Sequence, residues 1–331
     1  SACNPGGVTI VEDVVLTPNV FLGEVGGGNA TSSTTWMGNE FEVLVTAAEG
    51  ISIHALSVAP FNITGPFNID VYLTEDTFVG KESDITQWRL VASGTGVGNY
   101  VSFTNPNLAF VALNNPIYLP PGQHGMSVWI QDPLGGAIGM AYTNGPAAAP
   151  YVGADVTIHP NSLGISRTGL FSGSTFNPRL WNGGFYYGKC SQTIDPAFGF
   201  FGQGCAGSLP VSSMTAVTMP RINSTFTVDV DNLPNNDMFF MMGFNNTNWA
   251  LGPLPFDGTP YGFTGCFLRV DPQSAVYIGG ANNMATWSFS ILNIPSLLCQ
   301  KFYAQAIVFD PNAGNPALAV GSDAYAGQIG Q

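Results

Sequence analysis

The sequence predicts an all-β protein built from two tandem β-sandwich domains of jelly-roll type. Three observations predict this class. Short stretches alternate apolar and polar residues with a period of two, as half-buried strands do. Turn-forming residues are dense, with 41 Gly and 24 Pro among 331 residues. Apolar residues with helical spacing are interrupted everywhere by Gly, Pro or β-branched runs, so almost no helix is expected.

Residues 1–30 are predicted to form an extended N-terminal arm. Residues 8–16 read as a strand, and the glycines at 26–28 make a flexible hinge because glycine has no Cβ. Two interpretations remain open. The segment is an edge strand of the first domain, or it adds a strand to the open sheet edge of a neighbouring subunit.

The first domain is predicted over residues 31–189. Its alternation begins with Phe41, Val43 and Val45 on one face of a strand and residues such as Glu42 and Thr46 on the other. The same pattern predicts strands around 51–55, 69–73, 88–91 and 126–130. The domain closes at 179–187, and a connector over 189–196 puts the boundary near residue 190.

The second domain is predicted over residues 190–331. Phe226, Val228 and Val230 alternate with polar residues, and a turn rich in Asn and Asp follows over 231–237. Further strands are predicted at 266–270, 275–278, 286–292 and 302–309.

Composition excludes several classes of protein. Hydrophobic residues make up 45 % of the chain, which excludes disorder. Only eight Lys and Arg accompany 21 acidic residues, so a phosphate-tracking basic surface is absent and nucleic acid is not an expected partner. No apolar run reaches the roughly 20 residues of a membrane span. Because the chain opens on Ser1-Ala2-Cys3, we expect a secreted, extracellular or cell-surface protein whose signal peptide has been removed.

The five cysteines predict disulfides rather than a metal site. They are Cys3, Cys190, Cys205, Cys266 and Cys299. None forms a C-x-x-C motif, and only three histidines are present, which argues against zinc. In an exported chain we expect two disulfides and one odd thiol, which could cross-link subunits.

Catalytic patterns are missing, so the sequence predicts a protein that is not an enzyme. His54, His124 and His159 lie in unpromising contexts, and no G-x-S-x-G elbow accompanies them. A glycosidase needs two carboxylates across a cleft. Nothing in the sequence selects such a pair among the acidic residues.

Two local features point to ligands. The cluster of Asp229, Asp231, Asn232, Asn235, Asn236 and Asp237 has oxygen ligands suited to calcium, but it lacks EF-hand spacing, and an Asx-rich turn is the preferred interpretation. We therefore expect no cofactor, with calcium as a weak alternative. Trp249 lies in the loop sequence Asn-Asn-Thr-Asn-Trp and is the tryptophan most suited to stack on a sugar ring.

The second domain resembles a C-terminal module of secreted proteins from planctomycete-type bacteria. The resemblance covers about 125 residues and rests on landmarks in a fixed order: Gly204-Cys205-Ala206-Gly207-Ser208, Leu233-Pro234, Leu254-Pro255, Gly265-Cys266, Ile294-Pro295, and Phe302 to Ala306 leading to Asp310-Pro311. It implies a disulfide between Cys205 and Cys266. Cys190 and Cys299 then remain as a second pair, and Cys3 as the odd thiol.

The first domain is similar to sandwich regions of the same kinds of protein, through residues 70–74, Gly80, Trp88 and residues 181–183. The family brings no established activity.

Few charges, many turns and bridged loops suit a durable extracellular building block. We therefore expect a structural subunit of a self-assembling surface fibre, appendage or coat, a homopolymer held by apolar and edge-strand contacts. The alternative is an adhesin that binds surface glycans.

Overall fold

The computed structural model describes residues 13–16, 25–26, 36–102, 105–136, 138–144, 151–160, 164–190 and 195–331. The protein is all-β, with 58 % strand and 3 % helix, which confirms the predicted fold class. No helix in these ranges has the length and hydropathy needed to cross a membrane. The chain divides into two compact units: unit 1 holds residues 1–72, 76–83 and 92–195, and unit 2 holds residues 73–75, 84–91 and 196–331.

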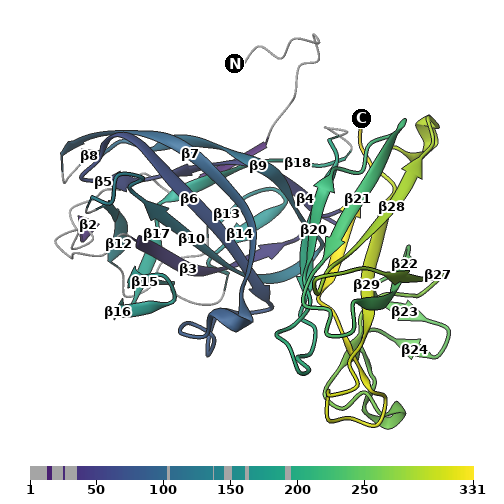
Figure 1. The fold of residues 1–331 in the computed structure, drawn as a ribbon. Helices are drawn as coiled ribbons and strands as arrows, with labels where there is room; N and C mark the ends of the chain where they lie inside the picture. Colours follow the sequence, from purple (N-terminus) through teal and green to yellow (C-terminus); the bar gives the residue numbers. More distant parts are fainter. Residues whose placement is uncertain are drawn as a thin grey trace. The chain divides into compact units, whose positions relative to one another are not determined.

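Unit 1 is built around a large antiparallel sheet (Figure 1). The strands that start in unit 1 are β1 (Asp13–Leu16), β2 (Val25–Gly26), β3 (Trp36–Val45), β4 (Ile51–Val58), β5 (Pro60–Phe61), β6 (Thr64–Glu75), β8 (Asn105–Pro106), β9 (Ala109–Leu119), β10 (Gly122–Gln131), β11 (Gly139–Met140), β12 (Tyr142–Asn144), β13 (Tyr151–Val152), β14 (Val156–Ile158), β15 (Ile165–Gly169), β16 (Ser172–Phe176), β17 (Arg179–Trp181) and β18 (Gly183–Gly188). The large sheet also contains β7 (Arg89–Ser102), which starts in unit 2, whereas β5 and β11, and β2, β12 and β17, form two small sheets. The main path runs β1-β18-β4-β9-β7-β6-β10-β3-β14-β13.

The core of unit 1 lies between two parts of this sheet that face each other. Phe41 of β3 stacks on Trp181 of β17 with ring centroids 4.8 Å apart, and Phe185 of β18 lies 6.5 Å from Phe41. Phe41, Val43 and Val45 are buried, as their alternation predicts. The sheet therefore curves back on itself, and its two facing parts form the two layers of a sandwich.

The second face of β3 is also buried, which the alternating pattern does not predict. Glu40 and Glu42 are 0 % and 3 % exposed. The Arg167 guanidinium lies on this side, with its Nε 3.9 Å from a Glu40 carboxylate oxygen, and Trp129 packs against Phe171 at 5.2 Å. Because Phe171 lies at the turn of the β15–β16 hairpin, that hairpin covers the face that a simple sandwich leaves in water.

Unit 2 is a smaller two-sheet sandwich. Its elements are β19 (Ala197–Gly202), β20 (Met214–Thr218), β21 (Ser224–Val230), β22 (Asp237–Gly243), β23 (Asn248–Trp249), β24 (Gly252–Pro253), β25 (Phe256–Asp257), β26 (Phe267–Leu268), β27 (Ser274–Gly279), β28 (Ala285–Ile291), β29 (Lys301–Phe309), β30 (Ala319–Gly321) and β31 (Ala324–Gln328), with the 3₁₀ turns η1 (Ile85–Gln87), η2 (Thr259–Tyr261) and η3 (Pro295–Leu297). One sheet has the order β19-β31-β29-β22-β27, and the other β20-β21-β28.

Aromatic rings fill the space between the two sheets of unit 2. Phe240 of β22 stacks on Trp287 of β28 at 4.3 Å. Phe226 of β21 lies 5.5 Å from Phe302 of β29 and 5.2 Å from Phe198 of β19. These contacts join the strands of one sheet to those of the other, so the predicted alternation at Phe226, Val228 and Val230 does mark a core face.

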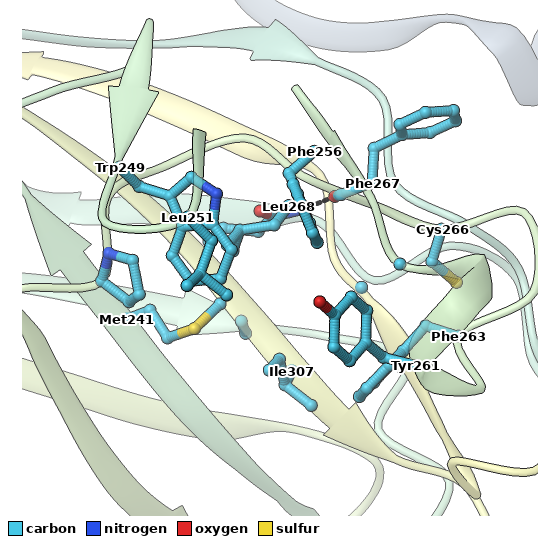
Figure 2. Close-up of a pocket in the computed structure, with 15 residues that line it drawn as sticks. Met241, Trp249, Leu251, Phe256, Tyr261, Phe263, Cys266, Phe267, Leu268 and Ile307 are labelled. Carbon is cyan, nitrogen blue, oxygen red and sulfur yellow. Dashed lines mark hydrogen bonds between the residues drawn. The ribbon is translucent and has the colours of Figure 1, made fainter. Parts of the chain in front are cut away.

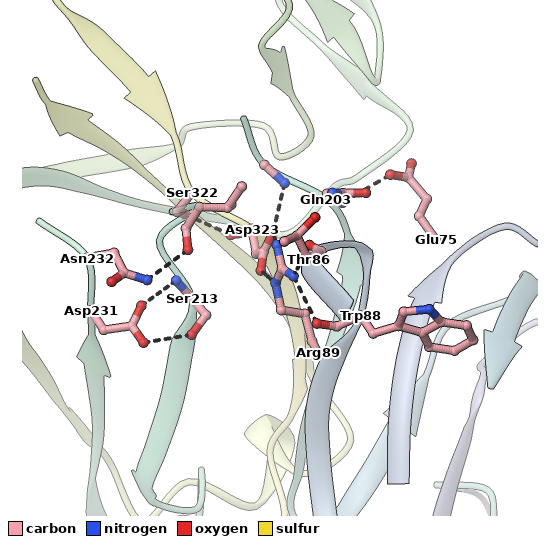
Figure 3. A network of polar contacts seen from close by, with 12 residues as sticks. Glu75, Thr86, Trp88, Arg89, Gln203, Ser213, Asp231, Asn232, Ser322 and Asp323 are labelled. Atoms are coloured by element: carbon pink, nitrogen blue, oxygen red, sulfur yellow. Dashed lines mark hydrogen bonds and ion pairs between the residues drawn. The ribbon is translucent and has the colours of Figure 1, made fainter. Parts of the chain in front are cut away.

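Two short segments from the first half of the sequence belong to unit 2 (Figure 3). Arg89 forms an ion pair with Asp323, which is fully buried. Glu75 forms an ion pair with Arg269 and accepts a hydrogen bond from the Gln203 amide at 3.0 Å. The C-terminal end of β6 and the N-terminal end of β7 thus belong to unit 2 and form arginine–carboxylate pairs within it, whereas the predicted first domain includes both segments.

Most predicted strands are present, and two differ in extent. Residues 266–270 contain only the two-residue β26, and Trp88 follows η1 instead of lying in β7. In the predicted arm, β1 pairs antiparallel with β18 of the same chain, at the end of the sheet order. That pairing matches the edge-strand interpretation. Most of residues 1–30 lie outside the described residues.

Candidate interaction site

An apolar pocket of about 280 Å³ lies in unit 2 (Figure 2). Met241 of β22 and Ile307 of β29 come from the sheet, and the remaining walls come largely from the segment between β22 and β27. Those walls are mainly aromatic and aliphatic: Trp249, Leu251, Phe256, Tyr261, Phe263, Phe267 and Leu268. The pocket is therefore suited to an apolar group.

Local hydrogen bonds explain why this segment folds over the sheet. The Asn245 side chain accepts hydrogen bonds from the Thr247 amide and hydroxyl at 2.8 and 2.9 Å, which forms an Asx turn before β23. Asp257 accepts the Thr259 amide at 2.8 Å where η2 begins. The rings then follow one another, with Phe256 5.0 Å from Trp249 and 5.6 Å from Tyr261.

A disulfide between Cys205 and Cys266 fixes the far end of the segment, with Cα atoms 5.2 Å apart. This is the pair that the resemblance implies. The Gly321 amide donates to the Cys205 sulfur at 3.1 Å, so the bridge also contacts β30. Cys190 and Cys299 are disulfide-bonded as well. Cys3 lies outside the described residues.

Trp249 is a pocket wall and not an open stacking platform. Its ring meets Phe256 edge to face, and its indole Nε1 is buried with no hydrogen-bond partner in the described chain. A sugar would also need polar partners. Gln305, the one amide side chain in the lining, already accepts from the Arg269 amide at 2.8 Å and donates to the Phe267 and Ser322 carbonyls at 3.0 Å. The pocket at Trp249 therefore suits an apolar group better than a glycan.

Exposed aromatic rings extend the apolar surface from the pocket toward the edge of the sheet. Phe239 of β22 lies 5.8 Å from Tyr277 of β27 and 5.5 Å from Phe309 of β29. Ile307, which lines the pocket, is the register partner of Phe239. Tyr277 is 57 % exposed, and its hydroxyl donates to Asp237 at 3.0 Å. These rings form one apolar face on the outside of the sheet.

One edge strand from each sheet of unit 2, β27 and β28, follow one another in the sequence, and we call these two strands together the open edge. β27 pairs with β22 on one side, and β28 pairs with β21 on one side. No other described strand pairs with either of them. The sequence from Ser274 to Ile291 contains no charged residue and no proline. Val276 and Phe289 are each 43 % exposed.

The acidic cluster at 229–237 is used by protein hydrogen bonds. Asp229 accepts the Thr286 hydroxyl at 2.6 Å, and Asp231 accepts the Ser213 amide at 2.7 Å. Asp237 accepts from Asn235 and Tyr277. Within the described ranges, no group of three or more His, Cys, Asp or Glu side chains is placed to hold a metal ion.

His124, His159 and Glu40 are titratable side chains of unit 1 that are buried within it. Burial lowers the pKa of His124, whose Nε2 lies 2.9 Å from the Pro120 carbonyl oxygen. His159 Nε2 accepts the Trp181 amide at 3.2 Å. Burial raises the pKa of Glu40 from 4.5 to about 8, against the opposing effect of Arg167. The contacts of these three buried side chains thus follow the packing of the sandwich.

Neither the pocket nor the open edge is predicted by the sequence. The stretch from Pro272 to Gln300 contains no charged residue, but an uncharged run over 90–131 is longer still, so charge alone does not mark the open edge in the sequence. A comparison with models of known protein families finds no match, and neither does a search of curated proteins. The resemblance to modules of secreted planctomycete-type proteins therefore stays a prediction.

Proposed function

We propose that the protein is a non-catalytic extracellular structural subunit that assembles with further copies of itself through the open edge of unit 2. The observation that carries this proposal is the unprotected character of β27 and β28. Soluble proteins commonly guard an edge strand with lysine, proline, a bulge or a covering loop, because unpaired N–H and C=O groups recruit other strands. The open edge has no charge and no proline over its whole length.

A second copy of the chain fits this edge by two kinds of contact. Its strand continues the hydrogen-bond ladder, which supplies main-chain hydrogen bonds. Its apolar side chains meet the exposed rings of Phe239, Tyr277 and Phe289, which are otherwise in water. β-branched, aromatic and small residues in Ser274–Gly279 also favour pairing between strands.

The charge of the protein sets the conditions for assembly. Each copy carries a net charge of −13, so copies repel one another at low ionic strength. Because the open edge itself is uncharged, salt screens the repulsion without weakening the contact. Assembly should therefore strengthen as salt is raised. Disulfides at four cysteines support an oxidising, extracellular location for the subunit.

The test is to measure assembly of three single variants beside the wild type by light scattering after size exclusion and by negative-stain electron microscopy. Val276→Lys and Phe289→Lys each place a charge on the open edge. Val97→Lys is the matched control, because Val97 is 69 % exposed on β7 and does not belong to the open edge. We expect ordered oligomers or filaments from the wild type and the control, and monomers from the two edge variants.

A wild type that stays monomeric at all protein and salt concentrations would refute the proposal. Assembly that survives both lysine substitutions would refute the open edge as its site. The aromatic face and the predicted arm would then be the remaining surfaces to test.

A further inference from the structure

A polar groove of about 470 Å³ lies on the outer face of the sheet in unit 1. It crosses five strands that are neighbours in the sheet order, β9, β7, β6, β10 and β3. Each strand contributes outward-facing residues, among them Asn114, Ser93 and Thr95, Asn68 and Asp70, Gln131, and Trp36. Its volume lies within the roughly 300–1,000 Å³ of sites for small organic ligands.

Hydrogen bonds within the groove hold its side chains in fixed orientations. The Ser93 hydroxyl donates to Asp70 Oδ1 at 2.7 Å, and the Thr95 hydroxyl donates to Asn68 Oδ1 at 3.2 Å. The Ser93 amide donates to Asn114 Oδ1 at 2.8 Å. Asp70, Asn68 and Asn114 are thus each held through their Oδ1 atom. Oδ2 of the aspartate and Nδ2 of the two asparagines remain available to a ligand.

The available atoms are complementary to hydroxyl groups. Asp70 Oδ2 is an acceptor, and the amide nitrogens of Asn68 and Asn114 are donors, with no partner in the described part of the chain. Gln131 adds an amide that both donates and accepts. A sugar hydroxyl can donate to the carboxylate while it accepts from an amide, so this set matches neighbouring hydroxyls on one ring.

Trp36 supplies the apolar part of such a site. It is half-buried at the start of β3 and is the register partner of Gln131 on β10. An indole face packs well against the C–H groups on one side of a pyranose ring, by dispersion and by attraction to the negative face of the ring. A flat apolar face beside fixed polar groups distinguishes sugar sites from purely apolar pockets.

We propose that this groove binds a neutral saccharide, with Trp36 stacking on a sugar ring and Asp70, Asn68 and Asn114 binding its hydroxyls. The ligand is neutral because the described lining includes the Asp70 carboxylate but no Lys or Arg to bind an acidic group. The site shares no residue with the open edge, since all its residues belong to unit 1. Binding here therefore does not depend on assembly.

The test is isothermal titration of the full chain with four neutral oligosaccharides, cellohexaose, laminarihexaose, xylohexaose and mannohexaose, and with oligogalacturonate as the acidic counterpart. We expect at least one neutral oligosaccharide to bind. Trp36→Ala and Asp70→Ala should each weaken it by about tenfold or more. Trp249→Ala, a tryptophan of the apolar pocket in unit 2, is the matched control and should bind as the wild type does.

Melting curves show whether each variant is folded. If Trp36→Ala or Asp70→Ala melts early, Asn114→Ala and Gln131→Ala replace it, because both side chains lie at the surface of the groove. Absence of binding to all four neutral sugars overturns the proposal. So does equal binding of oligogalacturonate, binding that persists in the groove variants, or binding that is lost in Trp249→Ala.

Discussion

Arg89 and Asp323 are 234 residues apart in the sequence and form a two-point ion pair inside unit 2. Arg89 Nε donates to Asp323 Oδ2, and Nη2 lies 3.2 Å from Oδ1. The Gly204 amide also donates to Oδ1, at 2.8 Å. Burial raises the pKa of Asp323, and Arg89 and Gly204 oppose that rise because they bind the ionised form. The end of a strand from the first half of the chain is thereby held in the second unit.

Replacing Arg89 by methionine should destabilise unit 2 strongly. The substitution keeps most of the side-chain volume but leaves the Asp323 carboxylate buried without its counter-ion. Loss of one partner of a buried pair costs about 3–5 kcal/mol. Urea unfolding followed by tryptophan fluorescence measures the change. Arg221→Met is the control, because Arg221 is exposed in the same unit and should change the free energy of unfolding little. If Arg89→Met lowers the free energy of unfolding no more than Arg221→Met does, the ion pair has no structural role.

The raised pKa of Glu40 predicts a particular pH dependence of stability. In the folded state its pKa is about 8, against 4.5 for the free side chain, so between these values the folded protein holds a proton that the unfolded chain has lost. The free energy of unfolding must then fall as pH rises through this range, by at most about 1.4 kcal/mol per pH unit, and level off above it.

Glu40→Gln should remove this slope and make the protein more stable than the wild type at the alkaline end. The comparison is a series of urea midpoints across the same pH range. Asp76→Asn serves as the control, since Asp76 is exposed and its left-handed backbone suits asparagine. A variant of Glu40 that keeps the wild-type slope would show that another group carries the pH dependence.

Removing the disulfide between Cys205 and Cys266 should loosen the pocket as well as destabilise unit 2. The two cysteines are 61 residues apart. In the chain-entropy model, a disulfide that closes a loop of this length raises the free energy of unfolding by about 4 kcal/mol. The double variant Cys205→Ser with Cys266→Ser leaves no free thiol from this pair. Thermal melting measures the stability, and quenching of tryptophan fluorescence by acrylamide measures access to Trp249. Melting and quenching equal to the wild type would mean that packing alone holds the segment.

Phe239 and Phe240 are neighbours on β22 whose side chains face opposite ways, so they separate stability from assembly. Phe240 is 2 % exposed and stacks on Trp287, and its replacement by alanine should cost about 3–5 kcal/mol. Phe239 is 39 % exposed on the aromatic face. Phe239→Ala should melt close to the wild type but assemble more weakly. If both variants lose stability equally, the outer ring is part of the core and not a contact surface.

The fold class and much of the strand pattern follow from local patterns in the sequence. Alternation at Phe41, Val43 and Val45, and again at Phe226, Val228 and Val230, marks faces that are buried in the structure. The period is a local property, because successive side chains of a strand point to opposite faces wherever the strand lies. The same locality explains why the boundaries of short strands such as β26 were less predictable.

What covers each face of a strand, and which distant residues meet, depends on how the whole chain packs. Alternation placed Glu42 opposite the core side chains, but that second face is buried too, where Thr77 after β6 donates to Glu42 and the β15–β16 turn packs on Trp129. Asn68, Ser93 and Asn114 belong to three strands whose neighbourhood is set by sheet order, so their groove is invisible in the sequence. Trp249 looked like an exposed loop residue because the sequence does not show that its loop folds over β22 and β29. Periodicity is a property of neighbouring residues. Sheet order, and ion pairs such as that of Arg89 with Asp323, depend instead on contacts between residues that are far apart in the sequence.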